Sequence, residues 1–277
     1  MTTLVLAGAI AVIAGGIAAV AGFGIGSLLT PALLPLLGTR LAVVAVAVPH
    51  AAGTALRLWR LRDAIDWKLL RGFGVASAAG GLAGAIAHGW LSGASLTRVF
   101  AGLLILSGLA ALFGWTKRVH LSAGPALLAG GLAGLFGGLV GNQGSIRSAA
   151  LLAFRLPPRA FVATATATAM IVDAARLPVY LSQSGAVLGD NSLLIMTMTA
   201  AVIAGTLVGD PILRTIPERW FSRVVGVLLL ALGVYMLTNA SGGGGPRMAA
   251  LLSSSGVAAR SGPSYMDGWP GHQGRHR

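Results

Sequence analysis

Long apolar stretches, almost free of charged residues, are the feature that most constrains how this chain can fold. A helix that crosses the hydrocarbon core of a bilayer needs about 17–25 mainly apolar residues. Six stretches meet that length: 41–59, 69–88, 96–115, 160–181, 191–213 and 220–238. Charged residues make up only 10% of the chain, whereas a soluble domain has about 25%. The sequence therefore predicts an all-α polytopic membrane protein and excludes a disordered chain, a coiled coil and a soluble enzyme.

Four shorter apolar stretches form two pairs, and a glycine-rich break separates the members of each pair. The first pair is 4–21 with 27–37, and the second is 125–140 with 145–156. The breaks read GFGIGS from Gly22 and GNQGS from Gly141. We expect each pair to form a helical hairpin that enters the membrane and returns, although the sequence does not fix how deep it reaches.

Short segments of the first half recur, in the same order, in the second half. Matching segments begin at 14 and 129, 26 and 144, 79 and 204, and 97 and 222. These matches predict two repeats, 1–118 and 119–240, each a Gly-broken helical hairpin plus three transmembrane helices. The remaining residues, 241–277, are rich in Gly, Ser, Pro and Arg, and we expect a disordered tail.

The basic residues predict the orientation in the membrane. If both hairpins return to the side they entered, each half crosses three times and the two halves are inverted. Only Arg40 and Arg98 then lie on one side of the membrane, and the other side carries nine basic residues: Arg60, Arg62, Lys68, Lys117, Arg118, Arg155, Arg159, Arg214 and Arg219. The positive-inside rule makes that richer side cytoplasmic and both termini non-cytoplasmic, in the inner membrane. Membrane topology thus explains the net charge of +13 without a nucleic-acid partner.

The paired breaks are the strongest candidate site, because irregular backbone at membrane depth is costly unless it is buried in protein or lines a cavity. Helices that restart near Ser27 and Ser145 would aim free N–H groups and a positive dipole end at the breaks, which favours an anion. The alternative to a binding site is that the glycines serve only close helix packing, which the four-residue spacing of Gly130, Gly134 and Gly138 also fits. The candidate substrate-binding residues at the breaks are Gly24, Gly26, Ser27, Asn142, Gln143, Gly144, Ser145 and Arg147.

Ionisable residues inside the apolar stretches are the next candidates. His50 follows Pro49 in the stretch 41–59 and aligns with Thr168 in the repeat, so we assign both to the substrate path. The alternative for His50 is a neutral ring bonded to a backbone carbonyl. Asp173 and Arg176 lie three apart on one helix and can pair. His50 and Asp173 are the candidate proton carriers.

Arg147 is the first of the arginines that we consider as an anion contact, followed by Arg176 and then by Arg57. Two basic side chains lie near predicted helix ends. The alternative for Arg57 is a side chain that extends to the cytoplasmic surface. We expect His88 to lie at the membrane interface. The sequence has no Cys and no His pair at metal-ligand spacing, which predicts no metal site. Without a P-loop pattern or a positioned nucleophile and base, we predict no cofactor and no enzymatic activity.

The segments AGFGIGSLLTPAL at 21–33 and GGLVGNQGS at 137–145, together with the two-half layout, resemble the TauE/SafE sulfite exporter family of membrane permeases. The resemblance covers about residues 4–240. It implies a permease that moves sulfite, sulfonates or other small anions. The second break reads Asn-Gln-Gly where the family commonly has more Gly, so the exact anion stays open.

These features predict a secondary transporter, with export favoured, of a small sulfur-containing or organic anion held between the two breaks at the membrane midplane. Export of an anion needs no coupled ion, since the membrane potential drives negative charge outward. An anion channel and a non-transport scaffold or assembly protein are the alternatives. The expected partners are the small anion and the lipid bilayer, and homo-oligomerisation is left open.

Overall fold

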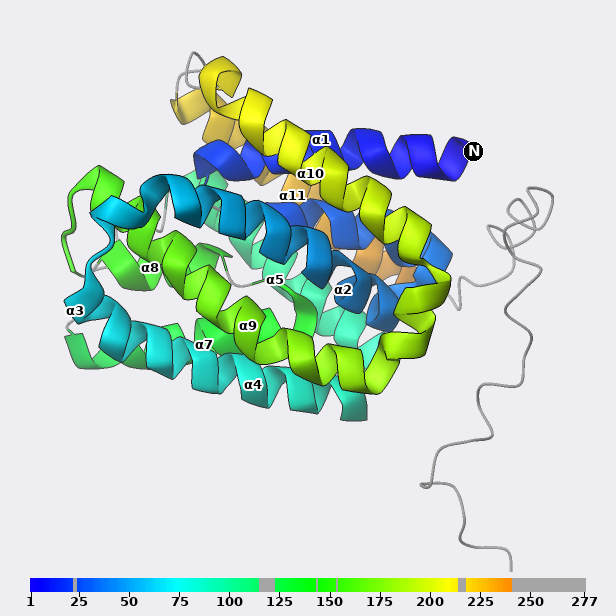
Figure 1. Cartoon of the computed structure of the whole chain (residues 1–277), viewed down its shortest axis with the longest axis horizontal. Helices are drawn as coiled ribbons and strands as arrows, with labels where there is room; N and C mark the ends of the chain where they lie inside the picture. The colour runs from blue at the N-terminus through cyan, green and yellow to red at the C-terminus, as the bar shows by residue number, and fades with distance from the viewer. Residues whose placement is uncertain (22–23, 115–122, 143, 153, 214–217, 241–277) are drawn as a thin grey trace, which may run out of the picture. The chain divides into compact units, whose positions relative to one another are not determined.

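The structure is a computed structural model that describes residues 1–21, 24–114, 123–142, 144–152, 154–213 and 218–240. Gln143 and the predicted tail lie outside the described residues. Every regular element within these ranges is helical, and the helices form a bundle (Figure 1). The α-helices are α1 (Thr2–Ala21), α2 (Ile25–Leu61), α3 (Trp67–Leu69), α4 (Val75–Trp90), α5 (Gly93–Phe113), α7 (Ala123–Val140), α8 (Gly144–Leu152), α9 (Pro158–Asp190), α10 (Ser192–Leu213) and α11 (Glu218–Ala240). Two short turns, η1 (Arg62–Ala64) and η2 (Leu70–Gly74), flank α3.

Six helical segments of the described chain are long and apolar enough to cross a membrane: Thr2–Ala19, Ile25–Ala64, Trp67–Trp90, Gly93–Phe113, Pro158–Asp190 and Ser192–Gly209. Large apolar side chains, such as Leu6, Leu128 and Met196, are exposed on the outside of the bundle, where lipid would cover them. The polytopic all-helical fold is therefore confirmed. The set of long apolar helices differs from the prediction in two members. Helix α1 is long enough to cross a membrane by itself, whereas the apolar part of α11, Arg223–Thr238, is shorter.

Helix α2 reverses direction at Gly38, whose backbone is non-helical (φ 69°, ψ 164°). In a straight helix, the 28 residues from Ile25 to Gly53 would span about 42 Å. Instead, a Cβ added at Gly53 would lie 3.0 Å from Cδ1 of Ile25. The element is thus two arms, 25–37 and 39–61, that pack against each other. The two apolar stretches read from the sequence remain distinct, and the second arm returns to the first break.

Glycine brings the long helices into backbone contact. A Cβ at Gly134 or Gly138 of α7 would collide with a carbonyl oxygen of α4, which confirms the packing role expected for these two residues. On the other side of the bundle, a Cβ at Gly205 of α10 would collide with the Val12 carbonyl of α1. Such contact requires residues without a side chain.

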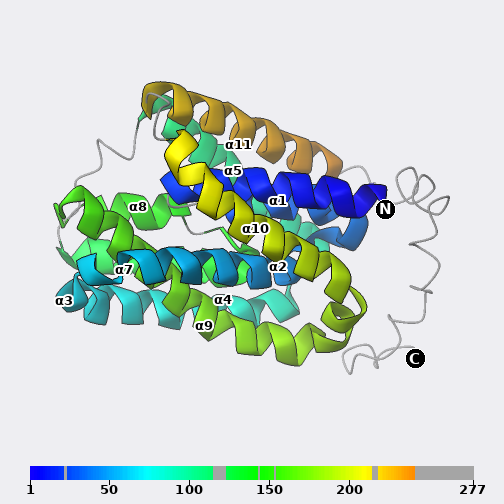
Figure 2. The ribbon, with the colours of Figure 1, turned by 45° about the horizontal axis from the view of Figure 1, so that its top comes forward.

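The helix pairs match between the two halves of the chain. In the predicted repeats, α1 corresponds to α7 and α4 to α10, and the observed partners are α1 with α10 and α7 with α4. The last helices of the halves, α5 and α11, pack on each other, with Gly108 and Gly226 each facing the other's carbonyl (Figure 2). This exchange of partners is consistent with two inverted repeats.

Candidate functional site

The two glycine-rich breaks touch one another. Helix α2 starts directly after Gly24 (φ 132°), and the second break begins at Gly141 (φ 74°), where α7 ends. Both values lie in the left-handed region that favours glycine. A Cβ at Gly26 would meet the Gly141 carbonyl oxygen. The structure therefore brings residues 115 positions apart in the sequence into contact at one junction.

A side-chain hydrogen bond also crosses this junction. The Ser27 hydroxyl donates to Oδ1 of Asn142 over 3.3 Å, and both side chains are buried. The amide nitrogen of Asn142 has no hydrogen-bond partner among the described residues. Because a buried amide N–H is costly to leave unsatisfied, this nitrogen is a donor available to a further group. Gly144 begins α8, and the buried Arg147 lies in its first turn. The side chain of Ser145 lies outside the described residues, as Gln143 does.

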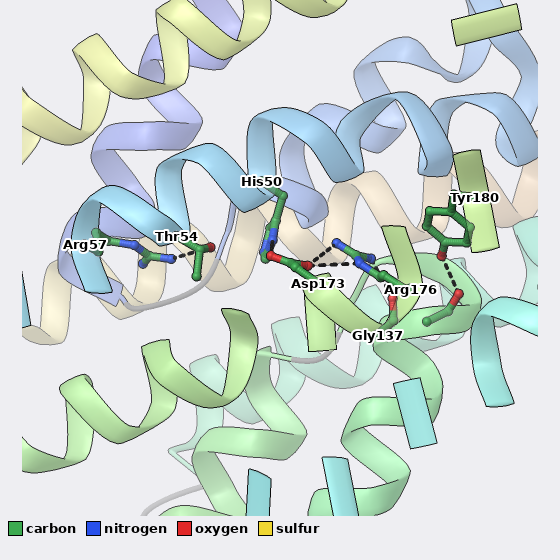
Figure 3. Close-up of polar contacts among 8 residues, drawn as sticks. His50, Thr54, Arg57, Gly137, Asp173, Arg176 and Tyr180 are labelled. Carbon is green, nitrogen blue, oxygen red and sulfur yellow. Dashed lines mark hydrogen bonds and ion pairs between the residues drawn. The ribbon is translucent and has the colours of Figure 1, made fainter. Parts of the chain in front are cut away.

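A buried charged cluster joins α2 to α9 beside the junction (Figure 3). Asp173 binds His50 through Oδ2, 2.7 Å from Nδ1, and Arg176 through Oδ1, 2.9 Å from Nε and 2.7 Å from Nη2. The predicted pairing of Asp173 with Arg176 is confirmed. The contact between Asp173 and His50 was not predicted from the sequence, because the two residues lie 123 positions apart.

Side chains from neighbouring helices complete the end of α7. The last four carbonyls of a helix lack intrahelical partners, and in a membrane each would be costly to leave bare. Arg176 donates to the Gly137 carbonyl over 2.7 Å, Tyr180 donates to that of Gly138, and His88 Nδ1 donates to that of Leu139 over 2.7 Å. His88, which the sequence places at the membrane interface, is buried inside the bundle by this hydrogen bond. The sequence also gave no signal for Tyr180.

Arg57 likewise binds an open carbonyl at the end of α1. Its Nη1 donates to the Ala18 carbonyl, in the last turn of α1, and its Nη2 donates to the Thr54 hydroxyl over 3.4 Å. The side chain is only 5% exposed. The burial of this side chain excludes the alternative in which it extends to the cytoplasmic surface. The second arm of α2 runs back to the first break, where the open carbonyl of Ala18 attracts the guanidinium.

The threonines of α9 serve helix contacts. Thr168 is buried, and its hydroxyl donates to the Thr164 carbonyl of the same helix over 2.8 Å. The Thr164 hydroxyl accepts from the backbone N–H of Asp66 over 3.0 Å, which ties α9 to the start of α3. The Thr166 hydroxyl has no partner within the described part of the chain.

Comparison with known proteins identifies the family. The family model described as sulfite exporter TauE/SafE matches residues 7–236, which include both breaks and the charged cluster. The chain belongs to the TauE/SafE sulfite exporter family. The resemblance read from the sequence is thereby confirmed, and the family is one of membrane transporters rather than of enzymes. Searches of curated proteins and of solved structures each returned no match.

In this TauE/SafE protein, the buried charge around the junction is mainly positive. Among the described residues, three arginines are buried, Arg57, Arg147 and Arg176, against one carboxylate, that of Asp173. The charges of Arg57 and Arg147 lie close enough to interact with each other and with Asp173. Over the same ranges, no group of three or more His, Cys, Asp or Glu side chains could hold a metal ion. Positive charge and N–H donors suit an oxyanion better than a cation.

Proposed function

We propose that this TauE/SafE protein is a secondary transporter, favouring export, of a small anion such as sulfite or a sulfonate, bound where the two breaks meet. The observation that carries the proposal is the contact between Ser27 and Asn142 across the breaks, with the Asn142 amide nitrogen left as a donor. A donor at the meeting point of two helix starts is the chemistry that an oxyanion requires.

The proposed site combines backbone and side-chain donors. Gly24, Gly26 and Gly144 let the anion approach the first N–H groups of α2 and α8, because no side chain covers them. Ser27, Asn142, Gln143, Ser145 and Arg147 are the proposed side-chain contacts. His50 and Thr168, buried on the facing helices α2 and α9, complete the proposed path.

Transport follows from the two-half design. The repeats 1–118 and 119–240 would rock about the junction and open it to each side in turn. The positive-inside rule supports a location of both termini on the non-cytoplasmic side of the inner membrane. A potential of 100 mV drives each exported negative charge with about 2.3 kcal/mol, so an exporter needs no coupled ion. For import, the pair of His50 and Asp173 would carry the coupled proton.

Anion uptake into proteoliposomes tests the proposal. The panel is sulfite, sulfate, thiosulfate, taurine and small carboxylates, each with and without a pH gradient and a membrane potential. We expect saturable uptake of one member, reduced at least tenfold in a Ser27→Ala/Asn142→Ala double variant. The matched control is Ser182→Ala, whose exposed hydroxyl donates to the Val179 carbonyl of its own helix, and its uptake should equal that of the wild type.

The other outcomes identify the alternatives. Flux that rises linearly with anion concentration would indicate a channel. No flux of any anion, from protein that elutes as a folded species, would overturn the proposal in favour of a scaffold.

A further inference from the structure

We propose that Arg57 supplies the positive charge that binds the transported anion beside the first break. The inference rests on the proposed function and adds to the site the arginine that the sequence ranked lowest of the three as an anion contact. It comes from comparing two arginines that occupy matching places in the two halves.

Arg57 and Arg176 are equivalent by position and by contact. Each donates to a carbonyl oxygen 39 residues earlier, in the last turn of the helix that ends at a break. Each also contacts the side chain three residues before it, which is Thr54 for Arg57 and Asp173 for Arg176. The two guanidinium groups thus have the same structural task.

They differ in the charge of that neighbour. Asp173 neutralises Arg176 at 2.7 Å, whereas the hydroxyl of Thr54 is neutral. Both hydrogen-bonded partners of Arg57, the Ala18 carbonyl and the Thr54 hydroxyl, are therefore uncharged. Its Nε has no hydrogen-bond partner among the described residues. Asp173 acts on Arg57 only from a distance, and a buried guanidinium with no charged hydrogen-bond partner is costly in a membrane. A bound anion would supply a counter-charge in direct contact.

The location of Arg57 fits this role. Ala18, which it caps, lies within the last turn before the first break, and Gly24 of that break packs on Ile17 and Ala18. Arg147, in α8 directly after the second break, lies close enough for the two positive charges to interact. An anion at the junction would offset this repulsion by its attraction to each of the two charges. Arg57 would then hold the end of α1 and bind the anion at once.

A pair of isosteric substitutions at Thr54 tests the inference. Thr54→Asp gives Arg57 the neighbour that Arg176 already has, and Thr54→Asn has the same size without the charge. We expect Thr54→Asp to raise the KM for transport of the panel anion at least tenfold, at unchanged protein amount. Thr54→Asn should change KM less than threefold. Arg57→Lys, which keeps the charge, should preserve most of the affinity, and Arg57→Gln should lose it.

The readouts separate this inference from the proposed function. Size-exclusion profiles and thermal midpoints in detergent establish that each variant is folded. If Thr54→Asp does not fold, the comparison of Arg57→Lys with Arg57→Gln still tests whether the charge of Arg57 binds the anion. If the Ser27→Ala/Asn142→Ala variant loses uptake while Thr54→Asp and Thr54→Asn have equal KM, the site stands and the role of Arg57 is refuted. If the wild type moves no anion of the panel, both fail together.

Discussion

Arg57 and Arg176 each donate a hydrogen bond to a carbonyl oxygen 39 residues earlier, in the last turn of a helix that ends at a glycine-rich break. The shared separation shows that the same kind of contact closes the helix end before each break. A helix interrupted inside a membrane leaves open carbonyls, and a guanidinium from the following long helix binds one of them. The two arginines differ in the charge of the neighbouring side chain, which is Thr54 beside Arg57 and Asp173 beside Arg176.

Replacing Asp173 by Asn should strongly destabilise the protein. The change leaves the buried Arg176 without its counter-charge, and removing one partner of a buried pair costs about 3–5 kcal/mol. Asp63→Asn is the matched control, because the Asp63–Arg159 pair is exposed and such pairs contribute about 0–1 kcal/mol. The free energy of unfolding, from denaturant titration in detergent, measures both. Equal losses in the two variants would contradict the importance of the buried pair.

Gly134→Ala should separate α7 from α4. The added methyl would collide with the Ser77 carbonyl oxygen, and such overpacking costs about 1–3 kcal/mol. Gly102→Ala serves as control, since a Cβ there meets nothing within 4 Å. We expect a lower thermal midpoint for the first variant and an unchanged or higher one for the second. A Gly134→Ala protein as stable as the wild type would argue against backbone contact at this position.

Gly26→Ala should reduce anion uptake and leave the helix content unchanged. Its methyl group would press against the Gly141 carbonyl oxygen and push the two breaks apart. Anion uptake should fall at least tenfold, while the far-ultraviolet circular dichroism spectrum keeps its helical form. In the control Gly8→Ala, the new Cβ would lie 3.6 Å from Thr197 Cγ2, an ordinary contact, so uptake should stay within twofold of the wild type. Normal uptake by Gly26→Ala would remove the junction from the transport path.

His50→Gln should uncouple transport from the pH gradient if the His50–Asp173 pair carries a proton. Glutamine can still donate to the Asp173 carboxylate but cannot bind a proton. The groups that face His50 are Asp173 and Arg176 from α9 and Arg57 from its own helix. Uptake driven by the potential alone, measured in the same variant, is the internal control and should stay within threefold. Stimulation by the pH gradient equal to that of the wild type would exclude His50 as the carrier.

Local sequence patterns were sufficient for the helices, the breaks and one ion pair. Apolar length marks a membrane helix wherever it occurs, and a three-residue spacing places Asp173 next to Arg176 on any α-helix. The glycine spacing at Gly134 and Gly138 likewise predicted close packing, which the carbonyls of α4 confirm. Each of these inferences needs only residues within a few turns of one another.

The contacts between distant segments could not be read in this way. Gly26 against Gly141, His50 against Asp173 and Arg57 against Ala18 all depend on how one helix lies against another. A bundle rich in Ala, Gly and Leu gives few side-chain signals for that choice. The positions of Arg57 and His88 near predicted helix ends suggested the cytoplasmic surface for the first and the membrane interface for the second. The reversal at Gly38 and the open carbonyls at the ends of α1 and α7 bring both inside. The sequence determined which segments enter the membrane and where they break, because these follow from local apolar length. The tertiary structure decided which polar groups meet there, because only packed helices bring such groups within hydrogen-bonding distance.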